Sequence, residues 1–132
     1  MRKLIVLLLL ITNVCFAQIG KTKKQMREEL SLKFSDTYIC DGKFDNTGQD
    51  WIGICESNVG SISLCYIFEK GICVEFNVRT DSEEASVIIA NLNKNKKLIR
   101  RGNKWVNEKE HIEWSIKDLP AQHIQVTCKK TK

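Results

Sequence analysis

A run of positive side chains is the densest group of chemically active residues in this sequence. Six cations fall within residues 94–104, which contain no acid, and Trp105 follows directly. Such a segment can hold phosphate, lipopolysaccharide or an acidic protein surface, because each of these is negatively charged. The same cations are also typical of a helix C-terminus or of a solvated loop. The candidate binding residues are Lys94, Lys96, Lys97, Arg100, Arg101 and Lys104.

The cysteines are the second set of residues with chemistry of their own. Five of the six follow the first 17 residues, so an odd number remains after removal of the segment described below. At least one thiol must then stay unpaired or pair between chains. Several pairings are open, including none at all. The five are Cys40, Cys55, Cys65, Cys73 and Cys128.

Metal and catalytic motifs are not recognisable. His111 and His123 fall in separate predicted strands without the ligand spacing of a zinc site, and the acids within residues 41–50 lack the spacing of an EF-hand. No nucleophile motif, phosphate-binding glycine loop or paired-carboxylate motif occurs. We therefore assign no catalytic residue, no metal and no cofactor, and we expect a protein without catalytic activity. A small secreted hydrolase, with a site assembled from scattered residues, stays open as an alternative.

The first 17 residues have the pattern of a signal peptide. Arg2 and Lys3 form a charged start, residues 4–14 are apolar, and Ala17 ends the segment before Gln18. This apolar run is shorter than the roughly 20 residues that span a membrane. We expect an exported protein, periplasmic or secreted, with no transmembrane segment and no nucleic-acid partner. Residues 18–132 then form a single domain, with an excess of three positive charges (19 Lys and Arg against 16 Asp and Glu).

The elements before residue 60 are a short helix and two short strands. Thr22 and Gln25 have capping-box spacing, and Met26 and Leu30 follow as one apolar stripe, which predicts an amphipathic helix. Residues 38–40 and 51–55 are predicted strands, separated by a segment rich in turn formers.

Residues 62–78 predict a β-hairpin. A turn at Glu69 and Lys70 with Gly71 in a left-handed bulge would place Phe68 opposite Ile72. That register puts alternate apolar residues, Ile72 and Val74 among them, on one face. A two-residue turn at Lys70 and Gly71 would instead split them between faces, so the first register is favoured. It places Cys65 and Cys73 as diagonal neighbours at the limit of disulfide reach, and we expect no bridge between them.

The C-terminal half predicts a helix followed by strands. Asp81 and Glu84 have capping-box spacing, and the residues that follow are apolar at i, i+3, i+4 and i+7 up to Leu92. A strand is predicted from Trp105, and residues 111–116 and 123–128 alternate as strands do. No internal sequence repeat was found. The prediction is an α+β fold, an antiparallel sheet of five to six strands with two helices on one face. Trp51, Trp105 and Trp114 are expected to pack in the core or on a sheet face rather than to form a ligand platform.

The pieces together resemble a group of small exported bacterial envelope proteins of uncharacterised function. The resemblance is carried by residues 20–22 with their helix, the hairpin turn at 68–73, the helix ending near Leu92 and the strand from Trp105. The opening helix is also similar to the start of β-lactamase-inhibitor-like and outer-membrane assembly small-protein modules, over about a dozen residues. Neither resemblance implies a functional residue here.

The sequence therefore favours a protein-binding module of the bacterial envelope that catalyses nothing. Its partner would be another envelope or secreted protein, bound on an exposed sheet face or along an edge strand. The alternative is a polyanion or lipid-headgroup binder that uses the basic segment 94–104.

Overall fold

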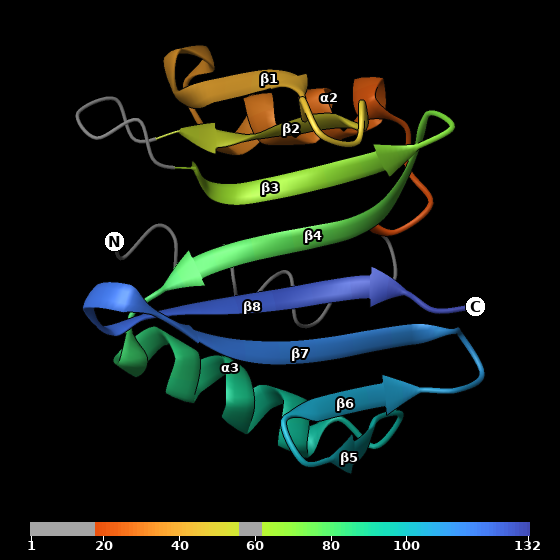
Figure 1. Ribbon diagram of the computed structural model, residues 1–132, viewed down its shortest axis with the longest axis vertical. Coiled ribbons are helices and arrows are strands. Elements are labelled where there is room, and N and C mark those ends of the chain that lie inside the picture. The colour runs from red at the N-terminus through yellow and green to blue at the C-terminus, as the bar shows by residue number, and fades with distance from the viewer. Residues whose placement is uncertain (1–17, 56–61) are drawn as a thin grey trace.

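The computed structural model describes residues 18–55 and 62–132, so the predicted signal peptide lies outside the described residues. The fold is α+β (Figure 1). In chain order the first half contains α2 (Lys23–Lys33), β1 (Ile39–Lys43), β2 (Asp50–Cys55), β3 (Ile62–Glu69) and β4 (Ile72–Thr80). The second half contains α3 (Ser82–Lys94), β5 (Ile99–Arg101), β6 (Lys104–Asn107), β7 (Ile112–Leu119) and β8 (His123–Lys130), with short 3-10 turns at Asp36–Tyr38 and Pro120–Gln122.

One antiparallel sheet contains all eight described strands, in the order β1-β2-β3-β4-β8-β7-β6-β5. The prediction of five to six strands was too low, whereas the sheet type and the two helices are confirmed. The edge strand β5 accounts for part of the shortfall. It has only three residues, all exposed, and lacks the apolar alternation by which a strand is recognised in a sequence. At the other edge, β1 overlaps the predicted strand 38–40 and continues through Asp41 and Gly42 to Lys43.

The strand order reveals a repeat that the sequence does not show. Each half of the chain is a helix followed by a four-stranded antiparallel meander, and the two meanders join through their last strands, β4 and β8. Asn77 pairs with Thr127 at this junction. The two halves therefore have the same order of secondary-structure elements although their sequences show no repeat. Packing requires only apolar residues of suitable size and spacing, so the residue identities can differ between halves.

Both helices begin at the predicted caps. Thr22 and Gln25 form the complete capping box of α2, with Oγ1 of Thr22 accepting from the Gln25 amide at 3.2 Å. Asp81 caps α3 by accepting from the Glu84 amide at 2.8 Å. The Glu84 carboxylate does not complete a box; it accepts a hydrogen bond from the Thr80 hydroxyl at 2.5 Å instead. Among the described residues, no helix is long and apolar enough to cross a membrane.

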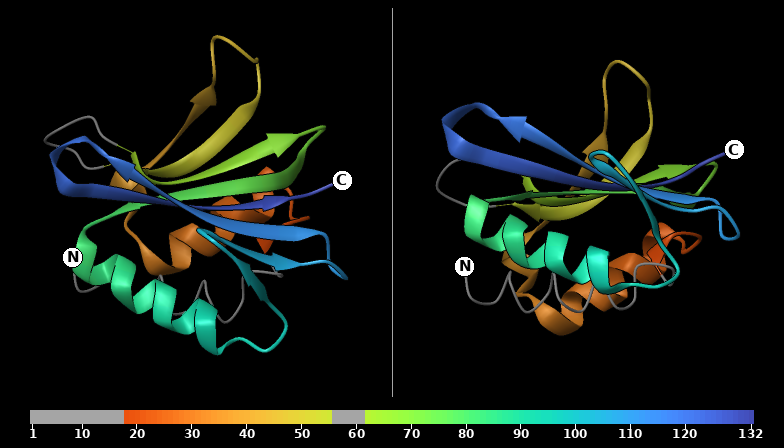
Figure 2. Two further views of the ribbon diagram at one scale, coloured as in Figure 1. Left: turned by 60° about the horizontal axis from the view of Figure 1, so that its bottom comes forward. Right: turned by 90° about the horizontal axis from the view of Figure 1, so that it is seen from below.

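The core lies between the helices and one face of the sheet. Figure 2 shows α2 and α3 on the same side of the sheet, where α2 packs against β1 and β2 and α3 packs against β8. Met26, Leu30, Ile88 and Leu92 supply the helical side of the core. On the sheet, one row of paired residues crosses six strands and is almost completely buried: Ile52, Tyr66, Phe76, Cys128, Trp114 and Trp105.

The β3–β4 hairpin differs from its prediction. Its turn is the two-residue one, with Lys70 and Gly71 both at positive φ, and Glu69 pairs with Ile72. A register shift before Phe68 then makes Tyr66 pair with Phe76 rather than with Val74. The two-residue turn and the apolar alternation are compatible because the bulge adds one residue and restores the alternation beyond it. Ile72 is consequently 40% exposed, and Cys73 takes the core position opposite Phe68.

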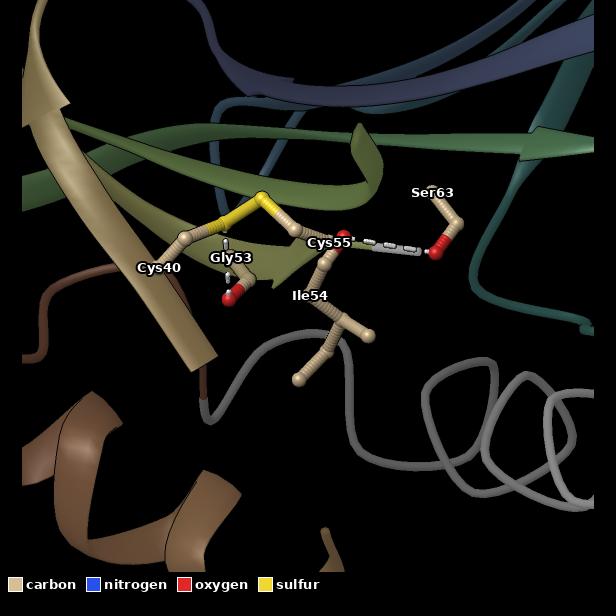
Figure 3. The surroundings of a disulfide bond; sticks show 5 residues. All are labelled: Cys40, Gly53, Ile54, Cys55 and Ser63. Carbon is tan, nitrogen blue, oxygen red and sulfur yellow. Dashed lines mark hydrogen bonds between the residues drawn. A yellow bond between two sulfur atoms is a disulfide. The ribbon is translucent and has the colours of Figure 1, made fainter. Parts of the chain in front are cut away.

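A disulfide joins the first two strands. Cys40 in β1 and Cys55 in β2 are bonded, with Cα atoms 6.0 Å apart (Figure 3). Cys40 pairs in register with Gly53, so Cys55 is its diagonal neighbour on the same face. Cys65 and Cys73 are free and buried, which agrees with the expectation that they do not form a bridge. The predicted reason was wrong in part, because the bulge places them on opposite faces of the sheet.

Candidate functional site

The sheet face that points away from α2 and α3 is the candidate functional site, and we call it the helix-free face. Side chains alternate between the faces of a strand, so the residues between the core positions point to this side. They form three rows across paired strands. The first contains Gly42, Trp51, Ile67, Glu75, Lys129, Glu113 and Val106; the second contains Cys40, Gly53, Cys65, Asn77, Thr127, Ser115 and Lys104; the third contains Arg79, Gln125 and Lys117.

The β1–β3 end of the helix-free face is apolar. The Trp51 indole lies against Gly42, where an added Cβ would be 3.2 Å from its Nε1, and the Phe44 ring is 6.1 Å away between centroids. Ile67, opposite Trp51, is only 7% exposed although no described helix contacts this side. Trp51, Trp105 and Trp114 were predicted to pack in the core or on a sheet face, and both places occur. Trp105 and Trp114 are buried in the core, whereas Trp51 lies half-buried on the helix-free face.

The centre of the helix-free face is a small polar network. Oδ1 of Asn77 accepts hydrogen bonds from the Thr127 hydroxyl at 2.6 Å and from Nε2 of Gln125 at 3.4 Å. All three side chains are half-buried and come from the adjacent strands β4 and β8. Because Oδ1 of Asn77 already has two donors, its amide nitrogen is left to donate to a group outside the network.

The β7–β6 end of the helix-free face is charged, with cations in excess. Glu113 lies between Lys104, at 3.3 Å, and Lys129, at 3.7 Å. Arg79 and Lys117 are exposed on the same face and have no ion pair or hydrogen bond with any described residue. The face therefore changes from apolar to positively charged between β2 and β7.

The basic segment 94–104, predicted from sequence as a binding patch, is divided by the structure. Arg100 stacks on the Trp105 ring at 5.0 Å, and Arg101 pairs with Glu108 at 2.5 Å. Lys104 belongs to the helix-free face, where it pairs with Glu113. Lys94 and Lys96 are exposed at and beyond the end of α3, and Lys97 is exposed in the loop to β5. The segment is thus not one continuous patch, because Arg100, Arg101 and Lys104 are held by other residues of the fold.

Two aspartates outside these groups are paired with cations of α2. Asp41 and Asp50 face α2 and pair with Lys23 at 3.4 and 3.6 Å, while Arg27 holds Asp41 at 2.7 Å. His111 is exposed in the turn before β7 rather than in the strand predicted for it, and His123 is exposed at the start of β8. Within residues 18–55 and 62–132, no three His, Cys, Asp or Glu side chains are grouped so that they could hold a metal ion. The buried acid Glu84 is held by Thr80 at the start of α3.

Two of the buried cysteines outside the disulfide, Cys65 and Cys73, are poor nucleophiles at neutral pH. Burial raises the pKa of Cys65 to about 12, with a smaller contribution from the negative charge of Glu75. Burial likewise raises the pKa of Cys73 to about 12. Because the thiolate is the reactive form, both side chains are inert as nucleophiles in the folded protein.

This pKa shift predicts slow alkylation of the native thiols. At pH 8 the thiolate fraction should be about a thousandfold lower in the folded than in the unfolded chain, since each pH unit below the pKa reduces it about tenfold. Iodoacetamide labelling followed by peptide mass mapping, with and without denaturant, measures the difference. Equal alkylation rates of Cys65 in the native and the denatured protein would contradict its burial.

The free energy of unfolding should also fall between about pH 9 and 12, because the thiols of the unfolded chain lose their protons at lower pH than the buried thiols do.

Comparison with known proteins gives no assignment: no family model matches the chain, no curated protein matches it, and no solved structure matches its fold. The residues of the helix-free face are therefore the basis for a function.

Proposed function

We propose that this protein is a non-catalytic binding module of the cell envelope or secreted space, and that it binds another protein on its helix-free face. The observation that supports this is the placement of both helices on one side of an eight-stranded sheet. The other face carries an aromatic cluster, a polar network and unpaired cations, and no described helix contacts it. Aromatic residues and Arg are enriched where proteins bind one another.

The chemistry of the face defines the kind of partner. Trp51 and Phe44 offer apolar surface at one end, and exposed cations offer positive charge at the other. A complementary surface has an apolar patch next to acidic side chains, and such complementarity gives specificity and speeds association. The partner is thus an acidic protein surface that covers several strands.

An exported location belongs to the same proposal. The Cys40–Cys55 disulfide is the kind of bond that forms and persists in oxidising compartments. It joins two neighbouring strands at the apolar end of the helix-free face, so oxidation also holds that end of the face in place.

A pull-down with residues 18–132 from envelope extract of the producing cell tests the proposal. We expect one protein to be retained both at low salt and at about 0.3 M salt, because an interface with a packed apolar part loses less to screening than a purely ionic one. Capture that vanishes at the higher salt would instead favour the anionic-ligand alternative and the basic segment 94–104.

Two single variants locate the interface. Trp51→Ala should weaken capture about tenfold or more, as truncation of an aromatic anchor does. Leu32→Ala is the matched control, since Leu32 is 87% exposed on α2, on the other side of the molecule, and its loss should leave capture unchanged. Thermal unfolding of both variants separates lost binding from lost structure. If Leu32→Ala abolishes capture and Trp51→Ala does not, the helix-free face is the wrong surface.

A further inference from the structure

Two unpaired cations lie on either side of one amide on the helix-free face. Gln125 in β8 pairs in register with Arg79 in β4 on one side and with Lys117 in β7 on the other. Paired residues on one face have Cβ atoms about 5 Å apart, so the two cations start about 10 Å apart with Gln125 between them. Both side chains are long enough to converge over the amide.

Neither cation is neutralised by an ion pair with a described residue. Arg79 and Lys117 are exposed and form no ion pair there. Asp118, next to Lys117, alternates to the other face, and Asp81 beyond the end of β4 caps α3. Within β4 and β7 the nearest acids on this face are Glu75 and Glu113, each four residues away, or roughly 13 Å at the usual rise. Glu113 is already held by Lys104 and Lys129.

Fixed amide groups lie beside the two cations. Gln125 is held by its hydrogen bonds to Asn77 and Thr127, at 3.4 Å each. Asn77 is two residues from Arg79 on the same face, and its Oδ1 is occupied, so its amide nitrogen can donate. Directional donors beside two cations match a carboxylate, which accepts several hydrogen bonds and benefits from the nearby charge.

We infer that Arg79, Gln125 and Lys117 form a subsite that takes a carboxylate side chain from an acidic segment of the partner polypeptide. This inference rests on the proposed function, because it supplies the contact by which the helix-free face selects an acidic protein. The apolar end of the face, around Trp51, then binds the apolar part of the same partner.

Charge reversal tests the subsite with a defined probe, a fluorescent peptide of about ten glutamates in low salt. R79E/K117E should weaken binding about tenfold or more, because two attractions become repulsions. K94E/K96E is the matched control: it makes the same change in charge at two exposed lysines outside the face, and should bind as the unaltered protein does. The milder R79Q/K117Q variant, checked by thermal unfolding, tests the subsite if the reversed variant does not fold.

The outcomes separate the subsite from the proposed function. Loss of peptide binding in K94E/K96E but not in R79E/K117E would overturn the inference in favour of the basic segment. Binding to phosphatidylglycerol vesicles without binding to the peptide would overturn it in favour of a lipid surface, and absence of peptide binding by the unaltered protein would also overturn it. If R79E/K117E captures a partner as well as the unaltered protein does, the subsite is refuted and the protein-binding proposal stands. If no partner is captured but binding of the peptide still requires Arg79 and Lys117, the proposed function fails and the acid-binding site remains.

Discussion

Replacing both bridged cysteines, in C40A/C55A, is expected to lower the free energy of unfolding by about 3 kcal/mol. The bond spans 15 residues, and in the chain-entropy account a loop of that length contributes about this much by restricting the unfolded chain. The loss should also weaken partner capture, because the bridge holds β1 and β2 together next to Trp51. Denaturant unfolding measures the change, provided that the dependence of the free energy of unfolding on denaturant concentration is the same in both proteins.

Reductant provides the control for the disulfide. Dithiothreitol should bring the unaltered protein to the stability of C40A/C55A and should leave C40A/C55A itself unchanged. A third variant, Cys65→Ala, keeps the bridge and removes a thiol from the same face, so its response to reductant should match that of the unaltered protein. Equal stability of C40A/C55A and the oxidised protein would show that the bridge contributes nothing to the fold.

Gly53→Ala is expected to cost about 3 kcal/mol, the upper end of what overpacking usually costs. An added Cβ would lie 2.0 Å from the Leu64 carbonyl oxygen, which belongs to the backbone of the buried strand β3 and cannot move aside as a side chain can. In an ordinary strand the same replacement would be mildly stabilising, because glycine loses more conformational freedom on folding than alanine. The sign of the effect thus reports the close approach of β2 and β3.

Gly42→Ala is the matched control on the neighbouring strand. The atoms nearest to its added Cβ would be those of the Trp51 indole, at 3.2 to 3.3 Å, and that side chain can shift. We expect a loss within about 1 kcal/mol together with a change in tryptophan fluorescence. Denaturant unfolding of both variants decides the point: similar losses at the two glycines would mean that the backbone contact at Gly53 is not special.

Local features of the fold could be predicted where the signal lies in neighbouring residues. Thr22 and Asp81 cap their helices as predicted, because a cap depends on a side chain and an amide three residues apart. The strand count and the β3–β4 register could not be predicted in the same way. The three-residue β5 is a strand only because β6 pairs with it, and the bulge at the hairpin is favoured because it returns Phe76 and Val78 to the core.

The sequence predicts only part of the candidate site. The run of cations at 94–104 is obvious in the sequence, but Arg100 and Arg101 are used within the fold. Arg79 and Lys117, which carry the subsite, are isolated cations 38 positions apart in the sequence. Nothing local relates them to Gln125. Only the pairing of β4 and β7 with the same strand, β8, brings the three into one row.

The sequence by itself determined the helix caps, the α+β class and the presence of an odd number of cysteines after residue 17, because each follows from spacing or composition. Tertiary structure alone decided which cysteines pair, that the chain contains two helix-and-meander halves, and which residues share the helix-free face. The physical reason is that side-chain direction in a strand follows from local alternation, whereas the neighbour on the next strand depends on register and strand order. Those are set by burial of the whole core, in which residues far apart in the sequence must fit together.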